Sequence, residues 1–189
     1  DSIRLEQQRI RKIEIAMRDF KESTIDTHYN VTIKSVPGCK ILSLRKTVAD
    51  YYCEGRLWEQ LYAFVREEQI KLSPGTNNLA IYHNGGTTED GVDIEVGVMV
   101  EREGADKGGF CYRETEPVED MACIMVYGPY ENIGLSYHAF ACWMEEHRQY
   151  EIAGPSRQIC HIGSWDESDS QKFLTEVQTP VRRILTLTP

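Results

Sequence analysis

The chain has 189 residues, of which 41% are hydrophobic and 27% are charged, and it carries a formal net charge of −9. This composition is ordinary for a globular protein, and no run of 18 apolar residues and no signal peptide is present, so no membrane span is expected. A surface this acidic repels phosphate backbones, so the chain alone is not expected to bind nucleic acid, whereas it favours cationic small molecules.

The first predicted element is a helix over residues 2–22, a stretch without Gly or Pro. Its apolar residues occupy the a and d positions of a heptad frame: Ile3, Ile10, Ile13, Met17 and Phe20. Such a stripe can pack on its own domain or pair with a second copy, and the sequence leaves both open. We treat residues 1–24 as a linker or coiled-coil segment and expect a homodimer through it. Because the chain begins at Asp1 without Met, we also expect a fragment of a longer protein.

Residues 29–187 are predicted to form one domain of two similar units, about 29–102 and 110–184. Each unit runs through a short apolar strand, a long helix, a second short strand and a final strand with a central carboxylate. These elements fall at 40–44, 57–71, 79–83 and 92–100, and again at 122–126, 133–148, 158–162 and 174–181. Two such units commonly pack about a pseudo-two-fold axis, and the cleft between them is a natural ligand site.

One further strand is expected to precede each unit. Residues 29–36 alternate between apolar and polar side chains, and the turn at 36–38 predicts a hairpin with the strand that begins at Lys40. Residues 111–116 are likewise expected to pair with the strand that follows them.

Glu176 is the sharpest candidate for a functional residue. Strict alternation places Leu174, Glu176 and Gln178 on one face of their strand. A lone Glu on a strand is more commonly a solvent-facing side chain, but Glu95 occupies the matching place in the first unit. Two carboxylates facing one cleft would favour an organic cation, or would give one of them a raised pKa and a proton to donate.

Aromatic side chains are abundant near the expected cleft. Taken singly, each is more commonly a core or interface residue, but together with buried carboxylates they would form a cage for a cation. Glu176 is expected to be the main anion and Glu95 the second. The expected aromatic contacts of the ligand are Tyr52, Tyr82, Tyr112, Tyr130, Tyr137 and Trp143.

The sequence predicts no metal site and no cofactor. Its six cysteines include no CxxC pair and are expected to be free thiols in a reducing cytoplasm. The five histidines show no metal-ligand spacing, and His83 and His161 match each other in the repeat, which favours a structural role. No nucleophilic triad motif and no phosphate-binding glycine loop is present.

Three segments carry a resemblance to a known family. Residues 128–131, 150–158 and 173–181 read Gly-Pro-Tyr-Glu, Tyr-Glu-Ile-Ala-Gly-Pro-Ser-Arg-Gln and Phe-Leu-Thr-Glu-Val-Gln-Thr-Pro-Val. In this order and spacing they resemble the GyrI-like effector-binding domain, over about residues 29–184. The resemblance implies an α+β fold, in which two strand–helix–strand units form one curved antiparallel sheet with two long helices and a ligand cleft between the helices.

The family includes the drug-sensing C-terminal domains of MerR-type and AraC-type transcription regulators. In MerR-type members a coiled-coil helix leads to the DNA-binding domain, and residues 2–22 are similar to the end of such a helix. DNA would then be reached only through a domain that precedes this chain. The resemblance places the family's ligand-binding acid at Glu176. Our leading hypothesis is therefore a regulatory domain that binds a cationic or amphipathic, multidrug-type effector.

Two other interpretations stay open. Some stand-alone members of the family hydrolyse cyclopropane-bearing toxins with the same Glu and a nearby Trp or Tyr, and Trp143 could fill that position beside Glu176. A related fold binds haem, and His83 or His161 would then be the axial ligand. An enzyme is the less favoured alternative to a ligand-binding domain.

Overall fold

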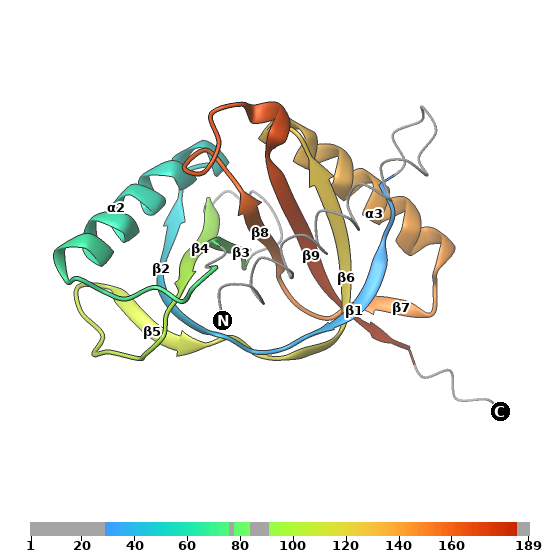
Figure 1. Cartoon of the computed structure of the whole chain (residues 1–189). Coiled ribbons are helices and arrows are strands. Elements are labelled where there is room, and N and C mark those ends of the chain that lie inside the picture. Colours follow the sequence, from blue (N-terminus) through green and yellow to red (C-terminus); the bar gives the residue numbers. More distant parts are fainter. Residues whose placement is uncertain (1–28, 76–77, 84–90, 185–189) are drawn as a thin grey trace.

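The computed structural model describes residues 29–75, 78–83 and 91–184 (Figure 1). The predicted helix over residues 2–22, and with it the expected pairing of two copies, lies outside the described residues. None of the helices in these ranges combines the length and the apolar character that a bilayer crossing requires.

A single curved antiparallel sheet forms the centre of the molecule (Figure 1). Its strands are β1 (Thr32–Val36), β2 (Lys40–Val48), β3 (Asn78–Tyr82), β4 (Val92–Met99), β5 (Phe110–Glu114), β6 (Val118–Tyr127), β7 (Tyr150–Ile152), β8 (Ser156–Ile162) and β9 (Leu174–Arg183). They follow one another across the sheet in the order β1-β6-β9-β8-β3-β4-β2-β5, and the short β7 also pairs with β9.

Two helices cover one face of this sheet. The helix α2 (Glu54–Glu67) packs on β2 and β4, and α3 (Ile133–Glu146) packs on β6 and β9. The buried side of α2 carries Leu57, Leu61 and Val65 at four-residue intervals, which is the spacing of an amphipathic helix. Short 3-10 turns lie at η1 (Tyr51–Cys53), η2 (Tyr130–Asn132) and η3 (Ser170–Lys172).

The two units expected from the sequence repeat are related by an approximate two-fold axis between β3 and β8. The first unit consists of β2, α2, β3 and β4, and the second of β6, α3, β8 and β9. Counted outward from this axis, β8, β9 and β6 of the second unit correspond to β3, β4 and β2 of the first. The predicted α+β class, with one curved antiparallel sheet and two long helices, is therefore confirmed.

The strand that precedes each unit pairs with the other unit. β1 pairs with β6, where Lys34 lies opposite Met121, and β5 pairs with β2, where Arg113 lies opposite Ile41. The expected hairpin of β1 with β2 and the expected pairing of β5 with β6 are therefore wrong. The reason is that β2 already pairs with β4 on one edge and β5 on the other, so β1 covers the edge of β6 instead. Figure 1 shows the chain crossing the width of the molecule between β1 and β2.

Apolar side chains are buried on both faces of the sheet. On the face that carries the helices, one cluster surrounds α2 and another surrounds α3. On the opposite face a smaller cluster lies across the two-fold axis and consists of Ile41, Leu79, Ile81 and Ile159, with Cys39 and Met99 against it. Because each helix covers its own unit, the central strands β3 and β8 lie between the two helices.

Candidate functional site

A cavity of about 780 Å³ lies on the helix side of the sheet, over the central strands. We call it the inter-helix pocket. Its floor comes from β3, β8 and β9 and consists of Asn78, Ala80, Gln158, Cys160 and Thr175. Its walls consist of Tyr51, Tyr52, Glu54, Gly55, Trp58, Glu59, Tyr62, Arg66, Tyr130, Ile133, Ser164 and Trp165.

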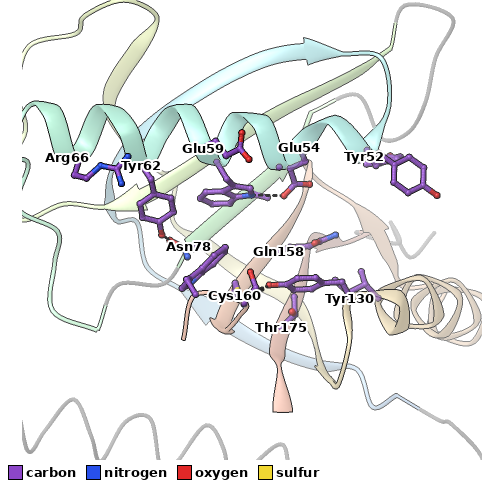
Figure 2. A pocket seen from close by; sticks show the side chains of 17 residues that line it. Tyr52, Glu54, Glu59, Tyr62, Arg66, Asn78, Tyr130, Gln158, Cys160 and Thr175 are labelled. Carbon is purple, nitrogen blue, oxygen red and sulfur yellow. Dashed lines mark hydrogen bonds between the residues drawn. The ribbon is translucent and has the colours of Figure 1, made fainter. Parts of the chain in front are cut away.

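One row of side chains on α2 supplies most of one wall. Glu54, Trp58, Tyr62 and Arg66 recur every four residues, so they share one side of the helix. Figure 2 shows Tyr62 reaching from α2 toward the floor, with Tyr130 on the facing side of the pocket. The row adjoins the buried stripe of α2, which places large aromatic rings at the border of the core.

Glu54 is the carboxylate that the structure fixes in this aromatic wall. Its Oε1 accepts a hydrogen bond from Trp58 Nε1 at 2.9 Å, and its Oε2 accepts one from the Tyr82 hydroxyl at 2.8 Å. Burial, together with the nearby Glu54, raises the pKa of Tyr82 well above its ordinary value, so Tyr82 stays a neutral donor. Two donors therefore hold the carboxylate in a single orientation beside the rings.

Trp165 closes the pocket from the loop between β8 and β9. Its ring lies 5.9 Å from the Trp58 ring and 6.0 Å from the Tyr62 ring, measured between centroids, and both pairs are tilted. These separations are within the range of favourable aromatic contacts. About half of Trp165 remains exposed, so the loop touches α2 without burying its own ring.

The facing wall brings Tyr130 close to Cys160. The Tyr130 hydroxyl lies 3.9 Å from Cys160 Sγ and accepts a hydrogen bond from the backbone N–H of Ser164 at 3.3 Å. Burial raises the pKa of Cys160 to about 11 and that of Tyr130 to about 12. A Cβ at Gly163 would lie 2.5 Å from Cys160 Sγ and 2.8 Å from the Tyr130 hydroxyl, so any other residue there would displace these two side chains.

Cys160 is expected to react slowly with the thiol reagent DTNB at pH 8. A pKa near 11 leaves on the order of one thiolate per thousand molecules, and the thiolate is the reacting species. The exposed Cys142 is the matched control. Cys142→Ser should remove one fast-reacting equivalent, and Cys160→Ser should remove none. Loss of a fast-reacting thiol equivalent in Cys160→Ser would contradict the raised pKa of the half-buried Cys160.

Two of the expected aromatic contacts line the inter-helix pocket, and two others form hydrogen bonds with residues that line it. Tyr52 and Tyr130 line it. Tyr82 supports Glu54, and Tyr137 accepts a hydrogen bond from the floor residue Gln158 at 3.2 Å.

Two of the expected aromatic contacts lie elsewhere. Tyr112 packs with the cluster around α2 and borders a separate cavity beside Ile70. Trp143 stacks on His147 at 4.3 Å between ring centroids and packs against Tyr150 in the cluster around α3. Both rings therefore contribute to the cores of their own units.

The expected placement of Glu176 and Glu95 in the cleft is corrected by the structure. On β9, Thr175 lines the inter-helix pocket and Val177 packs in the cluster around α3. Side chains alternate along a strand, so Glu176 points to the opposite face of the sheet. The same holds on β4, where Ile94 and Val96 pack against α2 and Glu95 faces the other way.

Glu95 is held on that opposite face by a cation and a histidine. Arg113 donates from Nε to Oε1 at 2.7 Å and from Nη2 to Oε2 at 2.6 Å, and His83 Nε2 donates to Oε2 at 2.8 Å. Burial by itself raises the pKa of Glu95, but the hydrogen bonds from Arg113, Ser43 and His83 lower it to about 2. Glu95 is therefore a carboxylate near neutral pH and carries no proton to donate.

Glu176 has an equivalent set of partners. His161 Nε2 donates to Oε2 at 2.8 Å, Lys34 forms an ion pair with Oε1 at 2.5 Å, and Gln178 Nε2 donates to Oε1 at 3.0 Å. Burial raises the pKa of Glu176, but the hydrogen bond from His161 and the charge of Lys34 bring it well below its ordinary value. The idea of a raised pKa at either carboxylate is thus corrected too.

The two carboxylate–histidine–cation clusters are related by the two-fold axis. In each cluster the cation comes from the exchanged strand, Lys34 from β1 and Arg113 from β5. Each ion pair therefore fastens an exchanged strand to the unit it joins. Among the described residues, no group of three or more His, Cys, Asp or Glu is arranged to hold a metal ion.

Sequence reasoning missed Glu54, Trp58, Tyr62 and Trp165. A signal existed for Trp58 and Tyr62, which are four residues apart on the predicted helix, but Glu54 precedes the predicted start of that helix at residue 57 and joins the row only because α2 begins at Glu54. No pattern marked Trp165, since its loop reaches α2 only through the tertiary fold.

Comparison with known sequences supports the observed architecture. The family described as GyrI-like small molecule binding domain matches residues 29–182. Among curated proteins, no sequence matches the chain.

Solved structures share the fold. The C-terminal domain of EcmrR is 22% identical, with a TM-score of 0.70, and the match covers 82% of this chain and 99% of that one. EcmrR in a complex with DNA is 24% identical, with a TM-score of 0.76, covering 96% of this chain and 70% of that one.

Two more distant structures share it as well. SAV2435 bound to tetraphenylphosphonium is 10% identical, with a TM-score of 0.58, over 81% of this chain and 94% of that one. A hydrolase from Listeria innocua is 10% identical, with a TM-score of 0.53, over 88% of this chain and 98% of that one. At these identities the likeness concerns the fold.

Proposed function

Because the chain belongs to the family of GyrI-like small molecule binding domains, we propose that its inter-helix pocket binds a lipophilic organic cation and that it is the effector-binding part of a transcription regulator. The domain would then convert the presence of such a compound into a change at a DNA-binding domain elsewhere in the protein.

The observation that carries this proposal is the fixed carboxylate in an aromatic wall. Trp58 and Tyr82 orient Glu54, and the rings of Trp58, Tyr62 and Trp165 lie around the same opening. A cation over the face of an aromatic ring gains about 0.5–2 kcal/mol, most when it is desolvated. A carboxylate held nearby adds charge complementarity that a neutral ligand of the same shape cannot use.

The comparisons add support of two kinds. SAV2435, which shares the fold, has been solved with the lipophilic cation tetraphenylphosphonium. EcmrR, which also shares it, has been solved in a complex with DNA. By analogy, this chain would reach DNA through another domain and would act as a homodimer through residues 2–22.

Ligand binding would act on the junction of the two units. The pocket takes its walls from α2 of the first unit and from η2, α3 and the loop bearing Trp165 of the second. A molecule that contacts both walls favours the arrangement in which they are closest. Such a ligand shifts an equilibrium only by its unequal affinity for the two arrangements, so contact with both units is what makes regulation possible.

Calorimetry with tetraphenylphosphonium tests the proposal, with neutral triphenylphosphine oxide as the matched probe. We expect the cation to bind saturably and the oxide to bind roughly tenfold more weakly or worse, a difference of about 1.4 kcal/mol. Equal affinity for both probes would show that the pocket selects apolar surface and not charge. Absence of saturable binding by the cation would overturn the assignment.

The hydrolase alternative would rest on Glu176 with its partner His161. The ion pair with Lys34 and the lowered pKa of Glu176 make this carboxylate a weak base toward water, so they fit a structural carboxylate better than a general base. Turnover of a cyclopropane-bearing substrate that is lost in Glu176→Gln would support the enzyme. Neither His83 nor His161 lines the inter-helix pocket, so neither is placed to be the axial ligand of a haem bound there.

A further inference from the structure

A second cavity, of about 510 Å³, lies on the face of the sheet opposite the helices. It is bordered by the segment that joins β5 to β6, by the turn 153–155 and by the end of β9. We call it the rear pocket. It shares no lining residue with the inter-helix pocket, so it is a separate site.

Arg157 on β8 is the unusual residue of the rear pocket. Only 8% of it is exposed, and its Nε is buried without a hydrogen-bond partner in the described part of the chain. Burial lowers the pKa of Arg157. The two other arginines at the pocket are satisfied, since Arg113 pairs with Glu95 and Arg182 pairs with Glu151. Arg157 forms no ion pair among the described residues, and Glu95 acts on its charge only at longer range. A buried guanidinium without an ion-pair partner is unfavourable and is therefore a place where an oxyanion gains affinity.

The two-fold axis shows that this charge is specific to the second unit. Ile81 pairs with Arg157 across the central strands, and Leu79 pairs with Ile159 in the equivalent position. Arg157 thus stands where the first unit has Leu79, at the border of an apolar cluster. The fold accommodates Leu at this position, so the arginine is not required by the architecture.

The neighbouring strand β9 carries a second buried polar atom without a hydrogen-bond partner. Gln178 lies opposite Arg157 in the pairing of β8 with β9, and its Oε1 is a buried acceptor without a donor among the described residues. Arg157 Nε is thus a donor and Gln178 Oε1 an acceptor without a hydrogen-bond partner, on two residues that pair across the strands. This indicates that a polar group from outside the two strands completes these hydrogen bonds.

The rim of the rear pocket carries the opposite charge. Glu116, Glu119 and Asp120 line it, and the whole chain has a net charge of −9. A dianion such as phosphate would be repelled by these acids, whereas a neutral zwitterion would not. Its carboxylate suits the planar fork of an arginine, and its ammonium suits the rim carboxylates. Apolar lining from Ile81 and Val118 accommodates an aliphatic side chain.

We propose that the rear pocket binds a small zwitterion with an aliphatic side chain, such as a free amino acid, with its carboxylate on Arg157 and its ammonium group toward the rim acids. The site would give this chain a second ligand, distinct from the cation of the inter-helix pocket. Binding there touches the end of β9 and the segment that leads into β6, so it would bear on the same junction of units.

Titration calorimetry with L-leucine tests this proposal on the full chain. Two matched probes lack one charge each: 4-methylpentanoate has no ammonium group, and 3-methylbutylamine has no carboxylate. L-leucine is expected to bind saturably, and both matched probes roughly tenfold more weakly or worse. Equal binding of 4-methylpentanoate would overturn the zwitterion assignment, and so would absence of saturable leucine binding.

Arg157→Leu is the informative variant, because Leu79 shows that the fold accepts Leu at the equivalent place. The affinity of this variant for L-leucine should fall roughly tenfold or more. The urea concentration at the midpoint of its denaturation should stay equal to or above that of the parent. Glu54→Gln, in the other pocket, should leave leucine binding unchanged. Leucine affinity that is unaltered in Arg157→Leu would overturn the proposal, whatever the outcome with tetraphenylphosphonium.

Discussion

Glu54→Gln is expected to weaken binding of the phosphonium probe roughly tenfold or more, a loss of about 1.4 kcal/mol. The substitution keeps the shape of the side chain and an oxygen that can accept from Trp58, but it removes the negative charge from the aromatic wall. Binding of the neutral phosphine oxide should change little, because that probe gains nothing from the charge. Calorimetry of both probes against both proteins measures the difference directly.

Two other carboxylates serve as controls for this result. Glu59 also lines the pocket, but its side chain is exposed. Because water and salt screen an exposed charge, Glu59→Gln should weaken phosphonium binding less than Glu54→Gln does. Glu176→Gln should leave probe affinity within about twofold, because Glu176 faces away from the pocket. If Glu176→Gln abolishes binding and Glu54→Gln does not, the ligand site lies on the opposite face and the assignment to Glu54 is wrong.

Glu95→Gln is expected to lower the free energy of unfolding at pH 7 by about 3 kcal/mol. The pKa of Glu95 falls from an ordinary 4.5 to about 2 because Arg113, Ser43 and His83 donate to its charged form. The variant leaves the guanidinium of Arg113 without its anion, and the ion pair that fastens β5 is lost. Urea denaturation of both proteins at pH 7 gives the comparison.

The difference in the free energy of unfolding between the parent and Glu95→Gln, which we call the deficit, should shrink as the pH falls. A carboxyl whose folded pKa is lowered stabilises the fold above its ordinary pKa, and this contribution is lost as the pH falls from about 4.5 toward 2. At pH 3 the deficit should be less than half of its value at pH 7. Glu151→Gln is the matched control, because the pair of Glu151 with Arg182 is exposed and contributes under about 1 kcal/mol. A deficit that does not depend on pH would contradict the ion-pair account.

The two clusters and the two pockets differ in how they follow the two-fold axis. The clusters around Glu95 and Glu176 are equivalent under the two-fold axis, which is what a structural task common to both units requires. The pockets break the symmetry. The inter-helix pocket depends on Glu54 and Trp58 from the first unit, and the rear pocket on Arg157 from the second. Symmetric features hold the molecule together here, and ligand recognition is proposed where the two units differ.

Much of the fold could be predicted because its signals are local. The periodicity of Leu57 and Leu61 sets the buried face of a helix, and strict alternation around Glu176 sets the two faces of a strand. The repeat itself identified Glu95 and Glu176, as well as His83 and His161, as equivalent pairs. These inferences need only residues a few positions apart, or a comparison of two segments of the same chain.

The sequence by itself determined the two units and the alternation around Glu176, because those follow from spacing along one segment, and its resemblance to a known family implied the sheet class. Only the tertiary structure decided which edge β1 and β5 would cover, which face of the sheet would meet the helices, and that Trp165 would reach α2. Alternation separates Thr175 from Glu176 but does not tell which of them faces the pocket. That choice follows from the packing of α3 on Val177, a contact between segments far apart in the chain. It places Glu54, and not Glu176, in the aromatic wall between the helices.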